Sequence, residues 1–188
     1  AIAMDPRNGE ILGMVSLPAF DNNLFSSPIE PETLQTLLDD PRRPLLNYAI
    51  GGTYPPGSIF KVVTGSGALQ EGIAGPNTVI ESRGVITVPN QYNPSILYKF
   101  YDWAALGRLN FYRAIAMSSD VYFYHLAGGY EDFKGLGIER LAGYTRMFGL
   151  GTPTAIDLPS EAAGAVRDPK WKLATFGEPW VTGDTYNF

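Results

Sequence analysis

Apolar and polar positions first follow a strand-like pattern and then a helical one. Residues 1–16 read AIAMDPRNGEILGMVS, two apolar runs around a turn with Pro6, Asn8 and Gly9, which predicts a β-hairpin. Helices are expected where apolar residues recur every three or four positions and Pro, Ser or Gly marks an end. These segments are residues 31–41, 58–71, 108–117, 121–127 and 137–151.

Two stretches lack such a period. Residues 75–107 are rich in Pro, Asn, Gly and Tyr and predict irregular or short β structure, and residues 152–180 predict a loop-rich segment. The combination of a hairpin with several helices indicates an α+β fold. With 188 residues, 45% of them hydrophobic, the chain can bury the core of one domain or most of one.

Composition narrows the possible functions. A formal net charge of -5 without a basic cluster argues against nucleic acid as a partner, because phosphate neutralisation supplies most of that affinity. The absence of cysteine excludes disulfides, thiolate metal sites and cysteine nucleophiles, and it fits an oxidising compartment. No apolar run is long enough to span a bilayer, and no signal-peptide pattern occurs. Because AIAMD and GDTYNF are unlike the polar ends of natural domains, we expect a longer parent protein.

The stretch GGTYPPGSIFK, residues 51–61, brings a serine to the start of a predicted helix. The prolines and Gly57 exclude helix before Ser58. Ser58 is therefore expected at or next to the helix N-cap, where free N–H groups and the helix dipole favour developing negative charge. Lys61 follows on the same face among apolar neighbours, so its amine can accept the serine proton. The pair is a candidate nucleophile and base, although it is also an ordinary helix start.

A second polar cluster, Ser118-Ser119-Asp120, separates two apolar helical segments. Each of the three residues can cap the helix that follows. A capped loop also holds a hydroxyl group in place, so capping and a catalytic part are compatible. His125, the single histidine, lies on an apolar helical face and is interpreted as a packing residue rather than as a triad member.

An S-x-x-K tetrad followed by a second serine motif resembles the penicillin-interacting serine enzymes. Within them, the chain is similar to the transpeptidase domain of elongation-type class B penicillin-binding proteins, the penicillin-binding protein 2 group. The order and spacing of the similar stretches are specific, and DVYFY and GDTYN point to this branch rather than to a β-lactamase. The stretches are MDPRNGEILGMVSLPAFDNN (4–23), PLLNYAI (44–50), YPPGSIFK (54–61), SSDVYFYHLA (118–127), GIERLAGYTRMFGLG (137–151), AIDLPSE (155–161) and FGEPWVTGDTYNF (176–188).

The resemblance implies a penicillin-binding, β-lactamase-like fold, in which helices sandwich an antiparallel sheet of about five strands and an all-helical subdomain is attached. It implies a serine D-Ala-D-Ala transpeptidase that cross-links peptidoglycan stem peptides in cell-wall elongation and is acylated by β-lactams, with no metal or organic cofactor. A membrane glycan polymerase is the implied partner. The implied location is the extracytoplasmic face of the bacterial cytoplasmic membrane, with an anchor absent from this chain.

The resemblance also implies a part for each motif residue. Ser58 would attack the penultimate D-alanine and Lys61 would be the general base. Ser118 would relay a proton to the leaving or attacking amine. Asp120 would hydrogen-bond Lys61 or the substrate amide, in a position where the wider superfamily has Asn and the elongation-type branch commonly has Asp. Read as S-x-V, Ser119-Asp120-Val121 leaves Ser119 as an alternative to Ser118, as in class D β-lactamases and their sensors.

The third family motif, K-T-G, does not occur in the chain. In the family it follows the GDTYN helix, so we expect residues 1–188 to form a partial transpeptidase domain with an incomplete sheet. Of two oxyanion-hole donors only the Ser58 backbone N–H would remain. A β-lactam sensor on the same scaffold and a β-lactamase-like hydrolase are the alternatives. The lack of an E-x-x-L-N tract weighs against the class A hydrolases.

Overall fold

The computed structural model describes residues 1–90 and 92–188 of the chain. These residues form two compact units. Unit 1 consists of residues 1–54 and 153–164, and unit 2 consists of residues 55–152 and 165–188. Every residue of the hydrophobic core described in the structure belongs to unit 2, so this unit holds the packing that can fix a site.

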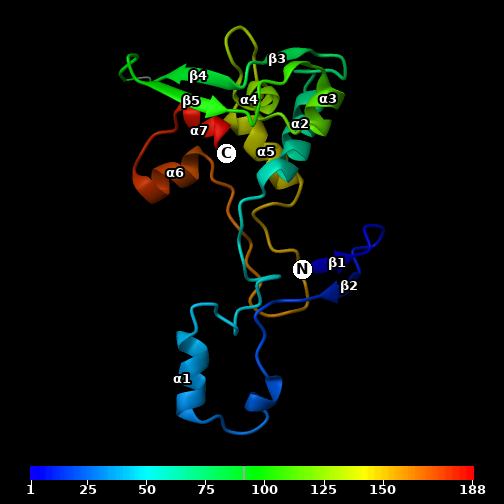
Figure 1. Ribbon diagram of the computed structural model, residues 1–188, viewed down its shortest axis with the longest axis vertical. Helices are drawn as coiled ribbons and strands as arrows, with labels where there is room; N and C mark the ends of the chain where they lie inside the picture. Colours follow the sequence, from blue (N-terminus) through cyan, green and yellow to red (C-terminus); the bar gives the residue numbers. More distant parts are fainter. Residues whose placement is uncertain (91) are drawn as a thin grey trace. The chain divides into compact units, whose positions relative to one another are not determined.

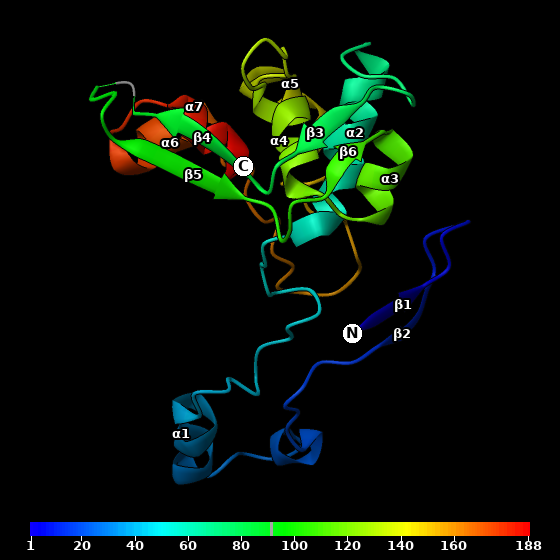
Figure 2. The same cartoon turned by 45° about the horizontal axis from the view of Figure 1, so that its top comes forward.

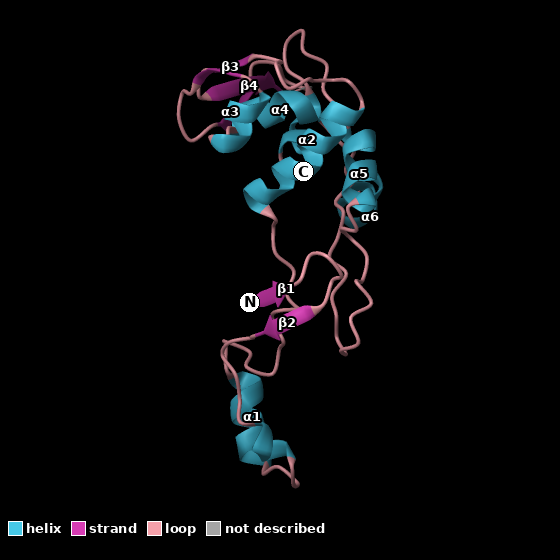
Figure 3. Ribbon diagram, turned by 90° about the vertical axis from the view of Figure 1, so that its right-hand side faces the viewer, coloured by secondary structure: helices cyan, strands magenta, loops and turns pink. Residues whose placement is uncertain are grey.

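Unit 1 is mostly loop (Figure 3). Strands β1 (Ile2–Met4) and β2 (Ile11–Met14) pair antiparallel with Ile2 opposite Met14, which confirms the predicted hairpin. A 3-10 turn, η1 (Asn22–Phe25), precedes helix α1 (Pro31–Asp39), which confirms the helix expected at 31–41. Proline at the first helical position suits α1, since its missing N–H would have no partner there.

Unit 2 contains the remaining helices and strands (Figure 1). In chain order they are η2 (Gly57–Phe60), α2 (Lys61–Gln70), β3 (Ile80–Ser82), β4 (Val85–Pro89), β5 (Leu97–Tyr101), β6 (Gly107–Leu109), α3 (Phe111–Ala116), α4 (Asp120–Gly128), α5 (Ile138–Met147), α6 (Pro169–Phe176) and α7 (Thr182–Tyr186). The short strands β3 to β5 confirm the expectation of short β structure in residues 75–107, and β6 extends into the segment that was predicted to be helical.

Helix α4 is the centre of unit 2. It contacts α2, α5, α7, β3 and β5, and Figure 2 shows it beside the β3–β6 pair. Tyr122 and Leu126 are fully buried, as expected for a helix that is hydrophobic on nearly all sides. Helix α2 lies close to its neighbours because it carries glycines. A Cβ atom at Gly65 would lie 2.9 Å from the Phe111 ring, and one at Gly67 would lie 2.9 Å from Tyr144.

The α+β class is confirmed, and the described strands form three two-stranded antiparallel pairs: β1–β2, β3–β6 and β4–β5. The larger sheet of about five strands that the resemblance implies is not assembled from the described residues. One reason lies at Gly84, which separates β3 from β4 and has a φ of 84°. This left-handed backbone turns the chain from its β6 partner to its β5 partner, and glycine adopts it without steric cost.

Two predicted helix boundaries were wrong, and one helix was not predicted. The helix expected from Ser58 begins with the 3-10 turn η2, and α2 starts at Lys61. The helix expected at 108–117 is shortened to α3 because Asn110 caps it, accepting a hydrogen bond from the Arg113 N–H at 3.0 Å. The loop-rich stretch 152–180 contains α6, with Asp168 as its N-cap and Gly177 as its left-handed C-cap. Both cap residues were visible in the sequence.

Candidate active site

The structure brings the four predicted site residues together around one amine. The Nζ atom of Lys61 lies 3.2 Å from Ser58 Oγ and 2.9 Å from Ser118 Oγ. It also lies 2.6 Å from the Ser118 backbone O and 2.6 Å from Asp120 Oδ1. Residues separated by up to 62 positions therefore meet at the Lys61 amine.

Ser58 and Lys61 owe their approach to the turn η2. In a 3-10 helix, side chains three residues apart lie directly above one another, so the Ser58 hydroxyl faces the Lys61 amine. Ser58 is exposed to solvent, whereas the Lys61 side chain is only 11% exposed and its Nζ lies 5.8 Å from the centre of the Phe123 ring. The site thus combines the accessible hydroxyl group of Ser58 with the mostly buried amine of Lys61.

Ser118 lies in a turn that ends α3 and starts α4. The Ser118 N–H donates to Ile115 O at 3.1 Å, and the Ser119 N–H donates to Ala114 O at 3.0 Å. This is the Schellman pattern, whose left-handed position is usually glycine, and Ser118 occupies that position with a φ of 52°. The unusual backbone turns both the carbonyl oxygen and the hydroxyl of Ser118 towards Lys61.

Ser119 has a different set of partners. It is fully buried and caps α4, its Oγ accepting from the Tyr122 N–H at 3.2 Å and donating to Asp102 Oδ2 at 2.6 Å. Within residues 1–90 and 92–188, no hydrogen bond joins Ser119 to Lys61. Of the two serines left open by the sequence, the structure therefore puts Ser118 at the amine and Ser119 in the helix cap.

Asp120 is the first residue of α4 and its side chain is 37% exposed. The N-terminus of a helix favours a carboxylate, and the Asp120 carboxylate also forms an ion pair with the Lys61 amine. His125 is the packing residue expected from the sequence. Its Nδ1 lies 2.8 Å from Val121 O, and its ring packs against Tyr130 and Phe133.

Asp102 contacts the second motif and was missed by the sequence analysis. It directly follows β5 and is 8% exposed. Its carboxylate accepts hydrogen bonds from Ser119 Oγ, from Ser82 Oγ at 2.9 Å and from the Val121 N–H at 3.2 Å. The sequence carried no signal for it, because these partners lie 17 to 20 residues away and form no local pattern.

The pKa of the Asp102 carboxyl leads to a prediction of how the unfolding free energy depends on pH. Burial raises this pKa, but the hydrogen bonds from Ser119, Ser82 and the Asp120 and Val121 N–H groups together outweigh burial and bring the pKa below the ordinary 3.8. A carboxyl with a lowered folded pKa stabilises the protein above its unfolded pKa, and this contribution is lost as the pH falls through the folded pKa. The unfolding free-energy difference between wild type and Asp102→Asn should therefore shrink from about pH 6 to about pH 3. Denaturant titrations at several pH values measure it, and a pH-independent difference would contradict the assignment.

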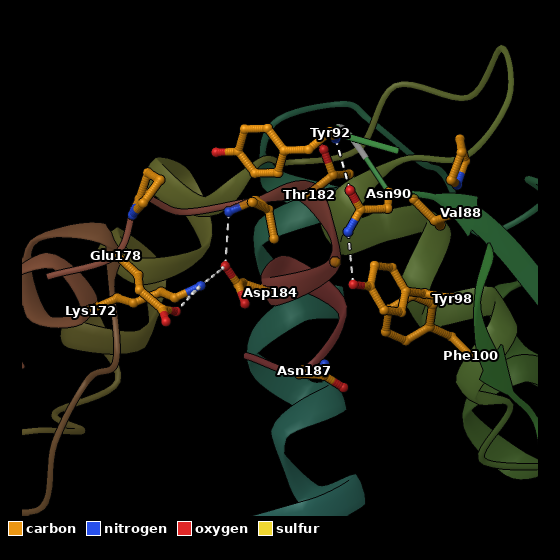
Figure 4. A pocket seen from close by; sticks show the side chains of 14 residues that line it. Val88, Asn90, Tyr92, Tyr98, Phe100, Lys172, Glu178, Thr182, Asp184 and Asn187 are labelled. Atoms are coloured by element: carbon orange, nitrogen blue, oxygen red, sulfur yellow. Dashed lines mark hydrogen bonds and ion pairs between the residues drawn. The ribbon is translucent and has the colours of Figure 1, made fainter. Parts of the chain in front are cut away.

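A separate hollow of about 450 Å³ lies in unit 2 between the β4–β5 hairpin and the segment from α6 to α7 (Figure 4). Its polar wall contains Lys172, whose Nζ lies 2.7 Å from Asp184 Oδ2. None of the four predicted site residues, Ser58, Lys61, Ser118 and Asp120, lines this hollow. We therefore assign the candidate chemistry to the surface around Ser58 and not to this hollow.

Residues 1–90 and 92–188 offer neither a metal site nor a membrane-spanning helix. No group of three or more His, Asp or Glu side chains there could hold a metal ion. No helix among the same residues has the length and apolar character needed to cross a membrane.

Comparison with known proteins confirms the resemblance inferred from the sequence. All of residues 1–188 match the family model described as the penicillin binding protein transpeptidase domain. The chain is 39% identical over 186 residues to the peptidoglycan D,D-transpeptidase MrdA of Acinetobacter baumannii, covering 98% of this chain and 26% of that protein. It thus spans about a quarter of the length of this curated relative.

Solved structures agree in fold. Penicillin-binding protein PBP2 of Helicobacter pylori, in complex with MreC, matches with a TM-score of 0.85 and 37% identity over 98% of this chain and 33% of that one. Penicillin-binding protein A of M. tuberculosis, as a ceftriaxone acyl-enzyme complex, matches with a TM-score of 0.72 and 31% identity over 89% of this chain and 37% of that one. The predicted penicillin-binding protein fold is confirmed.

Proposed function

Because the chain belongs to the penicillin-binding protein transpeptidase family, we propose that it carries the nucleophile of a peptidoglycan D,D-transpeptidase. The observation that carries the proposal is the Lys61 amine, within 3.2 Å of Ser58 Oγ and within 2.9 Å of Ser118 Oγ. This is the arrangement that activates a serine hydroxyl by an adjacent base. The substrate would be a peptidoglycan stem peptide ending in D-Ala-D-Ala.

The first half-reaction forms an acyl-enzyme. Ser58 Oγ attacks the carbonyl carbon of the penultimate D-alanine while its proton passes to Lys61 Nζ. A neutral amine has one lone pair for this proton and two N–H groups, which can donate to Ser118 O and Asp120 Oδ1. As the peptide C–N bond breaks, the leaving amine takes the proton through Ser118 Oγ, and free D-alanine departs.

The second half-reaction transfers the acyl group. The amine of a neighbouring stem peptide attacks the Ser58 ester, and its proton passes through Ser118 to Lys61. The ester C–O bond breaks, the proton returns to Ser58 Oγ, and the new amide is the cross-link. When Lys61 holds the proton, the carboxylate of Asp120 at 2.6 Å stabilises the ammonium.

The relatives are much longer than this chain, and their length bears on the parts of the protein outside residues 1–188. MrdA of Acinetobacter baumannii is about four times as long as the matched region, so we propose that a K-T-G motif and a membrane anchor lie outside residues 1–188. The Ser58 backbone N–H would be one oxyanion donor, and the second would come with the K-T-G segment. We further propose cell-wall elongation on the extracytoplasmic face of the membrane, with a glycan polymerase as partner.

Acylation by a penicillin tests the nucleophile. Full-length protein should gain the mass of one intact penicillin, because ring opening adds the whole molecule to Ser58 Oγ. Peptide mapping should place the adduct on Ser58, and Ser58→Ala should gain no mass. Intact-mass spectrometry measures both.

The fate of the adduct separates the transpeptidase from its alternatives. An adduct that persists for hours and a cross-linked product from stem peptides support the proposal. Rapid loss of the adduct with release of hydrolysed penicillin would instead identify a β-lactamase-like hydrolase. A persistent adduct without any cross-linking would identify a sensor.

A further inference from the structure

We infer that Asp102 and Trp103 form a clamp that holds the second serine motif against Lys61, with Asp102 as its principal positioning residue. Within residues 1–90 and 92–188 neither residue forms a hydrogen bond or ion pair with Ser58 or Lys61, and both bind the turn that carries Ser118. The inference rests on the proposed function for its catalytic consequence, but its geometric content can be tested without it.

The clamp forms hydrogen bonds with the turn on both sides of Ser118. On the C-terminal side, Asp102 Oδ2 accepts from Ser119 Oγ at 2.6 Å and from the Val121 N–H at 3.2 Å. On the N-terminal side, Trp103 Nε1 donates to the Met117 O at 2.9 Å. Ser118 is the residue between these two anchors.

Asp102 is itself held rigidly by its surroundings. Ser82 Oγ, at the end of β3, donates to Oδ2 at 2.9 Å, and the Trp103 N–H donates to Oδ1 at 2.9 Å. The Asp102 N–H donates to Gly84 O at 2.9 Å. Both carboxylate oxygens and the backbone are thus engaged, and Ser82 and Ser119 are at most 1% exposed.

The partners of Asp102 are all neutral. No Lys, Arg or His side chain within residues 1–90 and 92–188 forms an ion pair with it. A buried carboxylate without a counter-ion is costly unless hydrogen bonds satisfy it, and hydrogen bonds to a charged acceptor are about twice as strong as neutral ones. The negative charge therefore gives the cap of α4 a strength that Ser119 alone would lack.

The clamp has a catalytic consequence because Ser118 is in an unfavourable conformation. A left-handed backbone is unfavourable for a residue that carries a Cβ atom, so the turn relaxes when its anchors are removed. Relaxation moves the Ser118 carbonyl and hydroxyl, at 2.6 and 2.9 Å from Lys61 Nζ, and it moves Asp120 with the first turn of α4. A displacement of about 1 Å can cost about 100-fold in rate.

Acylation kinetics on the full-length protein test the clamp. The acylation rate constant and the dissociation constant for a fluorescent penicillin are measured separately for wild type, Asp102→Asn, Asp102→Ala and Trp103→Phe. We expect the rate constant to fall about 100-fold for Asp102→Ala and about 10-fold for Asp102→Asn and Trp103→Phe. The dissociation constant should change less than the rate constant, because the clamp acts on the position of Ser118 and Asp120 rather than on the nucleophile.

Asp168→Asn is the matched control. Asp168 also caps a helix of unit 2, accepting from the Trp171 N–H at 2.8 Å. Among the described residues its carboxylate binds Trp171 and Arg146 and no residue of the second motif. It should lower the melting temperature about as much as Asp102→Asn while leaving the acylation rate constant within about twofold. Equal rate constants for folded Asp102→Asn and Asp168→Asn would overturn the inference. If Asp102→Ala does not fold, Asp102→Asn and Trp103→Phe carry the same comparison.

Crystal structures of wild type and Asp102→Asn separate this inference from the proposed function. The clamp predicts that Ser118 leaves its left-handed φ in the variant and that the Lys61 Nζ to Ser118 Oγ distance exceeds hydrogen-bond range. If wild type is not acylated but the variant shows this displacement, the proposed function fails and the clamp stands. An unchanged Ser118 in the variant would overturn the clamp whatever the kinetics of wild type.

Discussion

Replacement of Lys61 by methionine will slow the acylation of Ser58 by a penicillin by about 1,000-fold, because a general base contributes about 100- to 10,000-fold. Methionine keeps an unbranched side chain out to the ε position and lacks the amine, whose Nζ lies 5.8 Å from the centre of the Phe123 ring. Stopped-flow measurement of adduct formation, with circular dichroism to verify folding, gives the rate. A rate within about tenfold of wild type would show that Lys61 is not the base.

Lys61→Arg separates proton transfer from charge. Arginine keeps a positive charge beside Asp120 but cannot lose its proton in proteins. If Lys61 accepts the Ser58 proton, Lys61→Arg should be about as slow as Lys61→Met. If Lys61 acts only by its charge, Lys61→Arg should retain most of the wild-type rate, and that result would contradict the proposed mechanism.

Replacement of Gly135 by alanine will destabilise unit 2 by about 3 kcal/mol or more, the upper range for overpacking. A Cβ atom there would lie 2.3 Å from the Gly129 N atom and 2.7 Å from the Ala127 O atom. Both are backbone atoms, so no side-chain rotation can relieve the contact. The same segment caps α4, since the Leu136 N–H donates to Leu126 O at 2.8 Å. Urea denaturation followed by circular dichroism measures the loss.

Gly143→Ala is the control for this prediction. Gly143 lies inside α5, and a Cβ atom there would meet no heavy atom within 4 Å. Alanine should stabilise the helix by roughly 0.5–1 kcal/mol, since glycine loses more backbone entropy on folding. If Gly135→Ala and Gly143→Ala changed the unfolding free energy by similar amounts, the prediction would be wrong. The C-terminus of α4 would then tolerate a shift of the backbone at residue 135.

The Asp102 clamp and the Schellman turn explain why a serine, and not a glycine, can occupy the left-handed position before α4. Glycine would fit the backbone, but it would remove the hydroxyl that lies 2.9 Å from Lys61 Nζ. The left-handed backbone of Ser118 is strained because the site needs a serine hydroxyl at this position. Strained backbone is common at functional sites. The anchors on either side, of which Asp102 is buried and Trp103 is 63% exposed, make the strained turn the stable one.

Local sequence patterns by themselves determined the hairpin of residues 1–16, helix α1, the α+β class and the pairing of Ser58 with Lys61. Each of these depends on residues within a few positions of one another, where turn chemistry and side-chain period act directly. The resemblance to penicillin-binding proteins extended this to Ser118 and Asp120, because whole motifs were matched.

Only the tertiary structure decided the features that depend on distant residues. It put Ser118 and not Ser119 at the Lys61 amine, because Asp102 and the α4 cap engage the Ser119 hydroxyl. It also revealed Asp102 itself, whose partners come from β3 and α4. A hydrogen bond across 17 to 20 residues leaves no periodic trace in a sequence, since any donor brought there by the fold can satisfy the buried carboxylate.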